Sequence, residues 1–427
     1  MESIRLNNVS FVDDGTKIHY DYQVSKGIKK YFDLENKFYV KYGQKVEDTP
    51  LGLAVIPFIS NIMPIAWFLD ADVIIEELDT KFYDAVLSLK EKFKEYFPNR
   101  RFKGDLEVEN LISDNIDGEE TALLFSGGLD SFECYTRNYN LNPFLISIHG
   151  ADVGIGDTKR WNDFVRYNSE EEIVNNERLF YIESNLREFY TYQVELLVNL
   201  GWWGKVQHGM ALLGVIAPLG YQLGIDKIFI ASSDTEGEID LNSSWGSSPF
   251  IDEKMRWANS KVIHDGYQFS RTDKTDNLVS YVKTTGIPIK LRVCYSEKRD
   301  GYNCNVCEKC QRTIFGLILS GADPNIYGFN VPDNIYELIL GNFTVNRTMD
   351  TAVKYLWKSL QVKAKSVDSL FILNNKEKEE KQVQEFINLD LDQIINTEGD
   401  EVTGTQKIKF VIRNRFPWLL KLYKSIK

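Results

Sequence analysis

The sequence predicts an α/β protein whose central unit is a doubly wound parallel sheet, joined to an N-terminal α+β domain and a helical C-terminal region. From residue 118 onward, apolar runs of strand length alternate with stretches of helical periodicity, as in a parallel sheet. The first of these runs ends in two glycines and a helix start. A chain of 427 residues also exceeds what one hydrophobic core usually serves. We therefore expect three domains, at residues 1–115, 118–325 and 326–427.

The N-terminal region carries short strand signals and two helix signals. Alternating polar and apolar residues predict strands at 18–22, 37–41 and 72–76, and the apolar stretch 51–62 predicts a buried helix. Asp79 is expected to cap a second helix, because the apolar residues after it recur at helical spacing. Those apolar residues are Phe82, Val86, Leu89, Phe93 and Phe97. The pattern indicates a packed core and points to no chemistry.

The central region contains the strands at which a ligand site is expected. Further strands are predicted at 142–149, 178–182 and 227–232, with helices from Thr158 and over 205–223 between them. In open parallel sheets, ligands lie at the carboxyl ends of the strands. We therefore expect the residues that end these strands to gather near the end of the first strand.

Composition excludes several classes of protein. With 43% hydrophobic residues the chain can bury substantial cores, and its net charge of −12 disfavours nucleic-acid binding by the whole surface. The first residues form no apolar signal segment, and the longest apolar stretch, 51–69, is interrupted by prolines and falls short of a membrane span. Four of the five cysteines are crowded at metal-ligand spacing, which fits a reducing compartment. We expect a cytoplasmic protein with no membrane span.

The most informative stretch is an apolar strand followed by a glycine turn and a helix start. The turn consists of Ser126, Gly127, Gly128, Leu129, Asp130 and Ser131. Glycines without Cβ atoms let the backbone approach an anion closely, and successive N–H groups at a helix N-terminus bind phosphate. Ser126 and Ser131 can add hydroxyl donors, and Asp130 can help to hold Mg²⁺, which prefers oxygen ligands shared with phosphates. The alternative is an ordinary Gly-Gly turn with a helix cap. Phosphate binding is favoured because five residues of the types that it requires fall within one six-residue segment.

This turn is not a Walker loop, because the chain contains no Gly-x-x-x-x-Gly-Lys-[Ser/Thr] segment. Segment 126–131 instead resembles the PP-loop of ATP pyrophosphatases, which use ATP to adenylate a substrate and release pyrophosphate. The resemblance implies an adenine nucleotide alpha hydrolase-like fold, with ATP and Mg²⁺ bound along the loop. It also implies that Ser126 and Asp130 are the catalytic residues.

Polar residues follow the other strands of the central region. His149 ends the second strand, and with Asp152 it either contacts the nucleotide or forms a structural turn. Ser232, Ser233 and Asp234 follow the fourth strand and can present hydroxyl and carboxylate groups to a polar substrate.

Other candidates lie in and after the long loop that follows the fourth strand. Trp245 and Trp257 either stack on a flat heterocycle or anchor the loop. Arg271 and Lys274 either neutralise a phosphate or carboxylate, or form an ordinary charge pair at a helix start.

A cysteine cluster follows the central strands. Its members are Cys294, Cys304, Cys307 and Cys310. Four thiolates, three of them spaced by two residues, match a tetrahedral zinc site that is structural because every ligand comes from protein. The same spacing leaves iron–sulfur ligation open. The lone Cys134 lies just inside the helix after the loop and is expected to be a small buried residue.

The loop and the cysteine cluster together resemble the 7-cyano-7-deazaguanine synthase (QueC) family over about residues 118–325. Members of that family bind zinc through such a cluster, use ATP to activate 7-carboxy-7-deazaguanine, and convert the acid through an amide to a nitrile with ammonia. The resemblance therefore implies zinc at the four cysteines. It also implies a substrate contact at Asp252, in the segment 248–252 that is nearest to the substrate loop of the family.

The chain departs from the housekeeping members of that family. It has His-Gly-Ala-Asp at 149–152 where they carry an Asp-Tyr-Gly-Gln-type segment, it lacks their Tyr-Pro-Asp-Cys-Arg-type segment, and it has large extra regions at both ends. These features resemble the longer QueC-like proteins of bacterial anti-phage defence systems, such as the Qat and nucleotide-signalling (CBASS) types. That branch implies a protein partner from the same system, and ammonia or an amine of that partner as acceptor. Adenylation of tRNA, and a scaffold that binds ATP without turnover, stay open as alternatives.

The region after residue 325 is predicted to be helical, with helices at 351–360 and 382–394. The tail 407–427 has seven basic residues and no acidic ones, interleaved with aromatic and aliphatic side chains. It either packs one side on the domain, or meets nucleic acid, an anionic membrane surface or an acidic partner.

Overall fold

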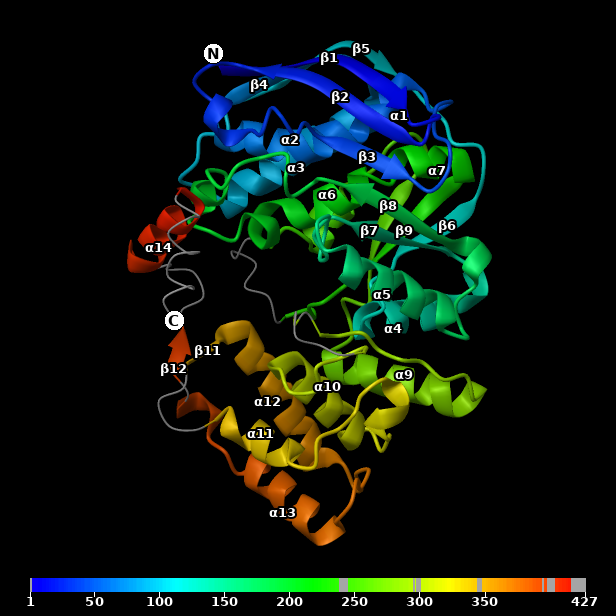
Figure 1. Ribbon diagram of the computed structural model, residues 1–427, viewed down its shortest axis with the longest axis vertical. Coiled ribbons are helices and arrows are strands. Elements are labelled where there is room, and N and C mark those ends of the chain that lie inside the picture. The colour runs from blue at the N-terminus through cyan, green and yellow to red at the C-terminus, as the bar shows by residue number, and fades with distance from the viewer. Residues whose placement is uncertain are drawn as a thin grey trace.

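The computed structural model covers most of the chain (Figure 1). The residues that it describes are 2–237, 245–294, 296, 301–343, 348–393, 395–397 and 404–415. The end of the basic tail, residues 416–427, lies outside the described residues.

A ten-stranded sheet runs through both the N-terminal and the central regions, in the order β10-β9-β6-β7-β8-β3-β2-β1-β4-β5. The strands are β1 (Glu2–Val12), β2 (Lys17–Val24), β3 (Tyr39–Tyr42), β4 (Ala71–Asp79), β5 (Leu106–Ile112), β6 (Glu120–Leu124), β7 (Phe144–His149), β8 (Leu179–Ser184), β9 (Ile225–Ala231) and β10 (Lys261–Asp265). Strands β6 to β10 pair in parallel. The two halves join where β3 pairs antiparallel with β8, with Val40 opposite Ser184. The fold is α/β with a mostly parallel sheet.

Helices cover the sheet and form the end of the molecule away from β1 (Figure 1). They are α1 (Leu51–Ala54), α2 (Ile56–Phe68), α3 (Thr80–Tyr96), α4 (Leu129–Arg137), α5 (Thr158–Glu170), α6 (His208–Gly214), α7 (Ala217–Leu223), α8 (Pro249–Asp252), α9 (Arg271–Thr285), α10 (Glu308–Leu319), α11 (Ile335–Gly341), α12 (Thr351–Ser366), α13 (Lys376–Ile387) and α14 (Gly404–Arg415). A small second sheet pairs β11 (Thr348–Asp350) with β12 (Ile395–Thr397). In the part of the chain that is described, no helix combines the length and the apolar character needed to cross a bilayer.

Local sequence signals explain several of these elements. Asp79 caps α3 as expected, because its side chain accepts a hydrogen bond from the Phe82 backbone N–H at 2.9 Å. The apolar helix expected near residue 51 is divided between α1 and α2, and α2 is buried along its whole length. The helix expected over 205–223 is divided into a π-helical turn, α6 and α7. Pro218 lies in the first turn of α7, where its missing N–H and its ring prevent continuation of α6.

Two cores divide the interior. The first lies beneath β1 to β5 and continues across the sheet to α6, α7 and the fully buried Trp257. The second joins α4 to α9, α10, α12 and α13, with Phe315, Trp357 and Phe386 in mutual ring contact. The helices after residue 325 therefore share their core with the helix that follows the glycine turn.

The strand order has a reversal at β6. From β6 the chain moves through β7 to β8 on one side, and it returns to place β9 and β10 on the other side. Ligands in open parallel sheets bind outside the carboxyl ends of the strands at such a point. The glycine turn follows β6 directly, so the fold places it there.

Candidate functional site

The turn after β6 has the strand, loop and helix arrangement that the sequence predicts. Gly127 has φ +68°, and Gly128 is the N-cap of α4. The Gly128 backbone N–H donates to Ser126 Oγ at 3.3 Å, and Ser131 Oγ donates to the Gly128 carbonyl at 3.1 Å. The two serine hydroxyl oxygens lie 3.1 Å apart. These bonds hold the loop in a compact shape, and the N-cap Gly128 provides no side-chain cap for α4.

Gly127 is required for a second reason besides its backbone angle. A Cβ at this position would lie 2.9 Å from Asn168 Oδ1. Asn168 lies on α5 and is 2% exposed, and among the described residues its Nδ2 has no hydrogen-bond partner although it is buried. The sequence offered no signal for Asn168, because it lies in a helix interior and reaches the loop only through tertiary packing.

The loop carbonyl groups face the segment that leads into the cysteine cluster. The Arg292 backbone N–H donates to the Gly127 carbonyl at 2.7 Å, and Arg292 Nη2 donates to the Ser126 carbonyl at 3.0 Å. Cys294 follows two residues later. The cluster and the loop are thus linked by a short, bonded stretch of chain.

Asp130 faces the start of α9. Arg271 Nη1 donates to Asp130 Oδ2 at 2.8 Å, whereas Asp130 Oδ1 is buried without a partner among the described residues. A capping box between Ser270 and Asp273 fixes the first turn of α9, which carries Arg271. A carboxylate oxygen that no protein donor satisfies is available to a cation.

Lys274 is buried in the same turn of α9. Its Nζ donates to the Ser232 carbonyl at 2.7 Å, and the side chain is 1% exposed. Ser232 and Asp234 bond to each other across a tight turn, whereas the neighbouring Ser233 is exposed. The structure therefore brings Arg271, Lys274 and the end of β9 to the loop.

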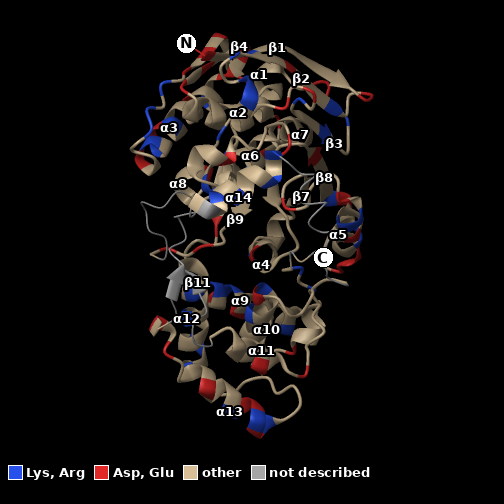
Figure 2. Cartoon of the chain, turned by 60° about the vertical axis from the view of Figure 1, so that its left-hand side comes forward, with Lys and Arg blue, Asp and Glu red and all other residues tan. Residues whose placement is uncertain are grey.

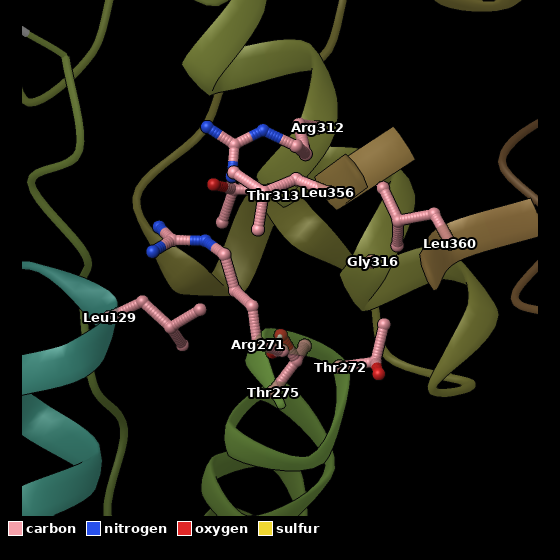
Figure 3. A pocket seen from close by; sticks show the side chains of 9 residues that line it. All are labelled: Leu129, Arg271, Thr272, Thr275, Arg312, Thr313, Gly316, Leu356 and Leu360. Atoms are coloured by element: carbon pink, nitrogen blue, oxygen red, sulfur yellow. Dashed lines mark hydrogen bonds between the residues drawn. The ribbon is translucent and has the colours of Figure 1, made fainter. Parts of the chain in front are cut away.

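Two further basic residues reach this site from α10. Arg312 is 6% exposed, its Nε donates to Glu308 Oε1 at 2.7 Å, and in the described part of the chain its buried Nη1 has no partner. Arg312 and Arg271 line one pocket. Their guanidinium groups lie on the same side of it, toward the start of α4 (Figure 3). The pocket is lined by Leu129, Arg271, Thr272, Thr275, Arg312, Thr313, Gly316, Leu356 and Leu360. Lys309 lies one turn earlier on the same helix.

Figure 2 shows basic residues at the parts of α9 and α10 that lie nearest α4. Burial lowers the pKa of Lys274, Lys309 and Arg312, and the positive charge of Arg271 lowers all three further. The carboxylate of Asp130 raises each of these pKa values and thus offsets part of the repulsion. Four cations crowded around so few carboxylates favour the binding of a multiply charged anion.

His149 lies in a different environment. Its ring stacks on Trp161 with centroids 4.4 Å apart, its Nε2 is 3.2 Å from the Gly154 carbonyl, and its Nδ1 is 3.5 Å from Glu183 Oε2. The side chain is 4% exposed. These contacts hold His149 in the turn after β7. They agree with the second of its two expected roles, a structural turn.

A second polar cluster surrounds α8. Asp252 is fully buried, and its Oδ2 is 2.7 Å from His264 Nδ1 and accepts a hydrogen bond from Ser247 at 2.8 Å. A Cβ on Gly209 would lie 2.0 Å from Asp252 Oδ1, so only glycine fits there. Asp252 is thus bonded inside the protein and is separate from the residues that bond to the loop.

An aromatic group lies beside that cluster. The His208 ring lies 5.0 Å from Trp203 and 6.1 Å from Trp245, and the Arg187 guanidinium lies 4.8 Å over Trp203. Burial lowers the pKa of His208, and Asp152 raises it. Asp152 also raises the pKa of Lys309, so its charge acts on both the aromatic group and the basic residues. Trp245 is 36% exposed whereas Trp257 is fully buried, so only Trp245 offers a ring face to a ligand.

The four cysteines converge as the sequence predicts. Their sulfur atoms all lie within 4.8 Å of one another and could hold a metal ion. The separations are 3.9 Å for Cys304 to Cys310, 3.8 Å for Cys294 to Cys307 and 3.4 Å for Cys307 to Cys310. Asn303 supports the site, because its Oδ1 accepts hydrogen bonds from the backbone N–H groups of residues 293 and 294.

The fold and the site define an α/β protein with a glycine turn at the carboxyl end of a parallel strand, a basic pocket facing that turn, and a four-cysteine cluster. Comparison of the chain with protein-family models, with curated proteins and with solved structures found no match.

Proposed function

We propose that the protein is an ATP-dependent enzyme of the QueC type, with a PP-loop ATP pyrophosphatase fold, that adenylates a carboxylate and transfers the acyl group to an amine. The observation that carries the proposal is that Arg271 and Arg312 lie together beside the glycine turn, where both line one small pocket with Leu129. Within the described residues, a buried guanidinium nitrogen of Arg312 and a buried carboxylate oxygen of Asp130 lack a partner, and Gly128 gives the α4 N-terminus no side-chain cap. Triphosphate with Mg²⁺ satisfies both at once.

In the first step a carboxylate oxygen of the substrate attacks the α-phosphorus of ATP. The bond between the α-phosphorus and the bridging oxygen breaks, and pyrophosphate leaves with that electron pair. The loop N–H groups, Arg271, Lys274 and Arg312 stabilise the charge on the departing phosphates. Asp130 Oδ1 would be a ligand of Mg²⁺, which neutralises charge on the same oxygens.

In the second step an amine nitrogen attacks the acyl carbon, AMP departs, and the nitrogen releases one proton. No strong nucleophile from the protein is needed, because adenylation provides a good leaving group. Cys134 is fully buried and does not take part.

The substrate that fits best is 7-carboxy-7-deazaguanine. Its flat ring would lie against Trp245, close to His208, with Arg187 available to an anionic or polar edge. The charge of Asp152 acts on both His208 and Lys309, which supports a ring site near enough to the phosphate site for an acid on the ring to reach the α-phosphate. Ser232, Ser233 and Asp234 at the end of β9 would complete the polar contacts.

The metal proposed for the cysteine cluster is zinc. A tetrahedral ion with Zn–S bonds of about 2.3 Å separates its sulfurs by about 3.8 Å. Three of the six separations are 3.4 to 3.9 Å and all six are within 4.8 Å, which supports a single ion of this kind. With four protein ligands its role is structural.

The acceptor is ammonia, giving an amide, or an amine of a protein partner, giving a deazaguanine conjugate. With ammonia, adenylation of the amide oxygen by a second ATP and its departure with AMP, with loss of the two nitrogen protons, would give the nitrile. The extra N-terminal strands and C-terminal helices support a macromolecular partner, in a cytoplasmic anti-phage defence system. A tRNA substrate is the second candidate, and the basic residues of α14 are the observation that favours it.

Pyrophosphate release from ATP tests the proposal. With 7-carboxy-7-deazaguanine present we expect release that depends on Mg²⁺, and its loss in the Asp130→Asn and Ser126→Ala variants. Asp163→Asn, which removes a half-buried helix carboxylate paired with the exposed Arg166, serves as the matched control and is expected to keep full activity. Release only with tRNA would support the second candidate, and no release with either would leave a non-catalytic ATP-binding scaffold.

A further inference from the structure

Helix α10 connects the cysteine cluster to the phosphate pocket. Cys307 is its N-cap and Cys310 lies in its first turn, so two of the four sulfur ligands determine where the helix begins. Lys309 and Arg312 lie in the same first five residues of the helix. The position of these two cations therefore depends on the segment that the cysteines hold.

Arg312 is the side chain through which this dependence reaches the pocket. The side chain is buried, and its Nε is held by Glu308 one turn earlier. Arg312 lines the pocket with Arg271 and Leu129 (Figure 3), and its Nη1 has no partner among the residues that the structure describes. Glu308 itself follows directly after Cys307. The guanidinium is thus aimed by a side chain that is next to a metal ligand.

A second connection runs through the opposite side of the cluster. Cys294 ends the segment in which Arg292 donates two hydrogen bonds to the carbonyl groups of Ser126 and Gly127. Asn303 bonds to this segment and to the Leu291 and Gly328 carbonyls, and it immediately precedes Cys304. The cluster therefore joins the segment that shapes the loop to the helix that supplies the pocket cations.

We propose that a metal ion at the four cysteines and a polyphosphate at the glycine turn bind cooperatively, because the metal holds Arg292 and Arg312 in the positions that the phosphates need. This inference rests on the proposed nucleotide site and goes beyond it, since it makes the metal a determinant of nucleotide affinity. By linkage, the nucleotide must tighten metal binding by the same factor. Couplings of this kind are about 5- to 150-fold.

Whether the metal strengthens or weakens nucleotide binding distinguishes positional coupling through the arginines from a direct electrostatic effect of the metal site. Four thiolates around a divalent ion carry a net negative charge, which by itself would weaken binding of an anion nearby. Positional coupling through α10 and the Arg292 segment has the opposite effect. Tighter nucleotide binding by a metal-loaded protein, compared with a metal-free protein that is still folded, is therefore the result expected if the metal acts by fixing the two arginines.

The first test measures binding of a non-hydrolysable Mg-ATP analogue to the full-length protein by calorimetry, with zinc loaded and after its removal. We expect affinity for the analogue to fall at least about fivefold without zinc. Equal or tighter binding by the zinc-free protein would overturn the inference and leave the nucleotide site intact. Absence of binding even by the zinc-loaded protein would overturn the proposed nucleotide site and this inference with it.

A second measurement does not require a folded zinc-free protein. Zinc transfer to an excess of chelator is timed with and without the analogue, and we expect the analogue to slow transfer at least about fivefold in the natural protein. In Arg312→Gln this slowing is expected to become smaller, because only the connection through Arg292 remains, while zinc content without the analogue is unchanged. Arg166→Gln, which alters an exposed arginine of α5, is the matched control, and in this variant the analogue should still slow zinc transfer. Transfer that the analogue does not slow in the natural protein, or slows equally in Arg312→Gln, would contradict the inference.

Discussion

Arg271 Nη1 donates a hydrogen bond to Asp130 Oδ2 at 2.8 Å, across the gap between α9 and the start of α4. Both side chains are mostly buried, at 18% and 23% exposure. In the absence of nucleotide, the residue expected to bind Mg²⁺ is therefore partly neutralised by a residue expected to bind phosphate. In the proposed reaction, Mg²⁺ would take the place of Arg271 beside Asp130, and phosphate would take the place of Asp130 beside Arg271.

Replacement of Arg271 by Gln should shift the two affinities in opposite directions. Without the guanidinium, Asp130 is less well compensated, so Mg²⁺ alone should bind more tightly. The ATP analogue should lose a charge-assisted hydrogen bond of about 1.5–3 kcal/mol, a factor of about 10 to 150 in affinity. Titration of the variant with Mg²⁺ and with the analogue measures both. Unchanged affinity for both ligands would show that this ion pair has no part in the site.

Gly127→Ala should disrupt the loop. Alanine at a φ of +68° costs about 1–2 kcal/mol, and the added Cβ would lie 2.9 Å from Asn168 Oδ1. We expect a lower melting temperature and loss of analogue binding. Gly156→Ala is the matched control, since nothing lies within 4 Å of a Cβ at that position. Normal nucleotide affinity in Gly127→Ala would argue against phosphate binding at this turn.

Trp245→Ala should affect the heterocyclic acid and leave ATP binding unchanged. Stacking on an aromatic side chain contributes about 1–3 kcal/mol per base, so KM for 7-carboxy-7-deazaguanine should rise about 5- to 150-fold. Because Trp245 is 36% exposed, stability should change little. Trp257→Phe is the contrasting variant, since Trp257 is fully buried and its replacement should lower stability without raising KM. An unaltered KM in Trp245→Ala would place the acid elsewhere.

At alkaline pH, the protein should take up protons when it binds nucleotide. Burial lowers the pKa of Lys274 from its usual 10.5, so the free protein loses this charge at a lower pH than an exposed lysine does. Bound phosphates favour the charged form and raise the pKa again, and affinity should therefore fall as pH rises through the lowered value. Calorimetry in buffers of different ionisation enthalpy measures the uptake. Lys274→Met should abolish it, and uptake that persists in this variant would assign the titration to another group.

The affinity for nucleotide is expected to fall as pH rises, whereas the contribution of Lys274 to the folding stability of the nucleotide-free protein is expected to rise with pH. A lysine whose pKa is lowered on folding binds fewer protons in the folded state than in the unfolded state. Its burial therefore destabilises the free protein at neutral pH, and this penalty is relieved as pH rises toward 10.5. Anion binding removes the same penalty at neutral pH.

The features predicted correctly from the sequence are those that depend on neighbouring residues. The strand, glycine turn and helix start at 121–131 follow from an apolar run, from glycine's backbone freedom and from helix capping. The cap at Asp79 and the convergence of the four cysteines likewise depend on spacing within one stretch of chain. Strands β1 and β5 are not among the predicted strands, because a β-bulge at Leu6–Asn8 interrupts the alternation in β1 and β5 is mostly exposed.

The arrangement of the pocket depends on contacts between residues that are far apart in the chain. Pairing of β3 with β8 extends the sheet, and packing of α10 against α9 brings Arg312 beside Arg271. Asn168 reaches Gly127 in the same way. Residue spacing along the chain encodes helix faces, turns and ligand motifs, because these are set by backbone geometry over a few residues. Which distant side chains meet depends on the sum of many weak packing contacts across the whole core, and that sum is settled only when the chain has folded.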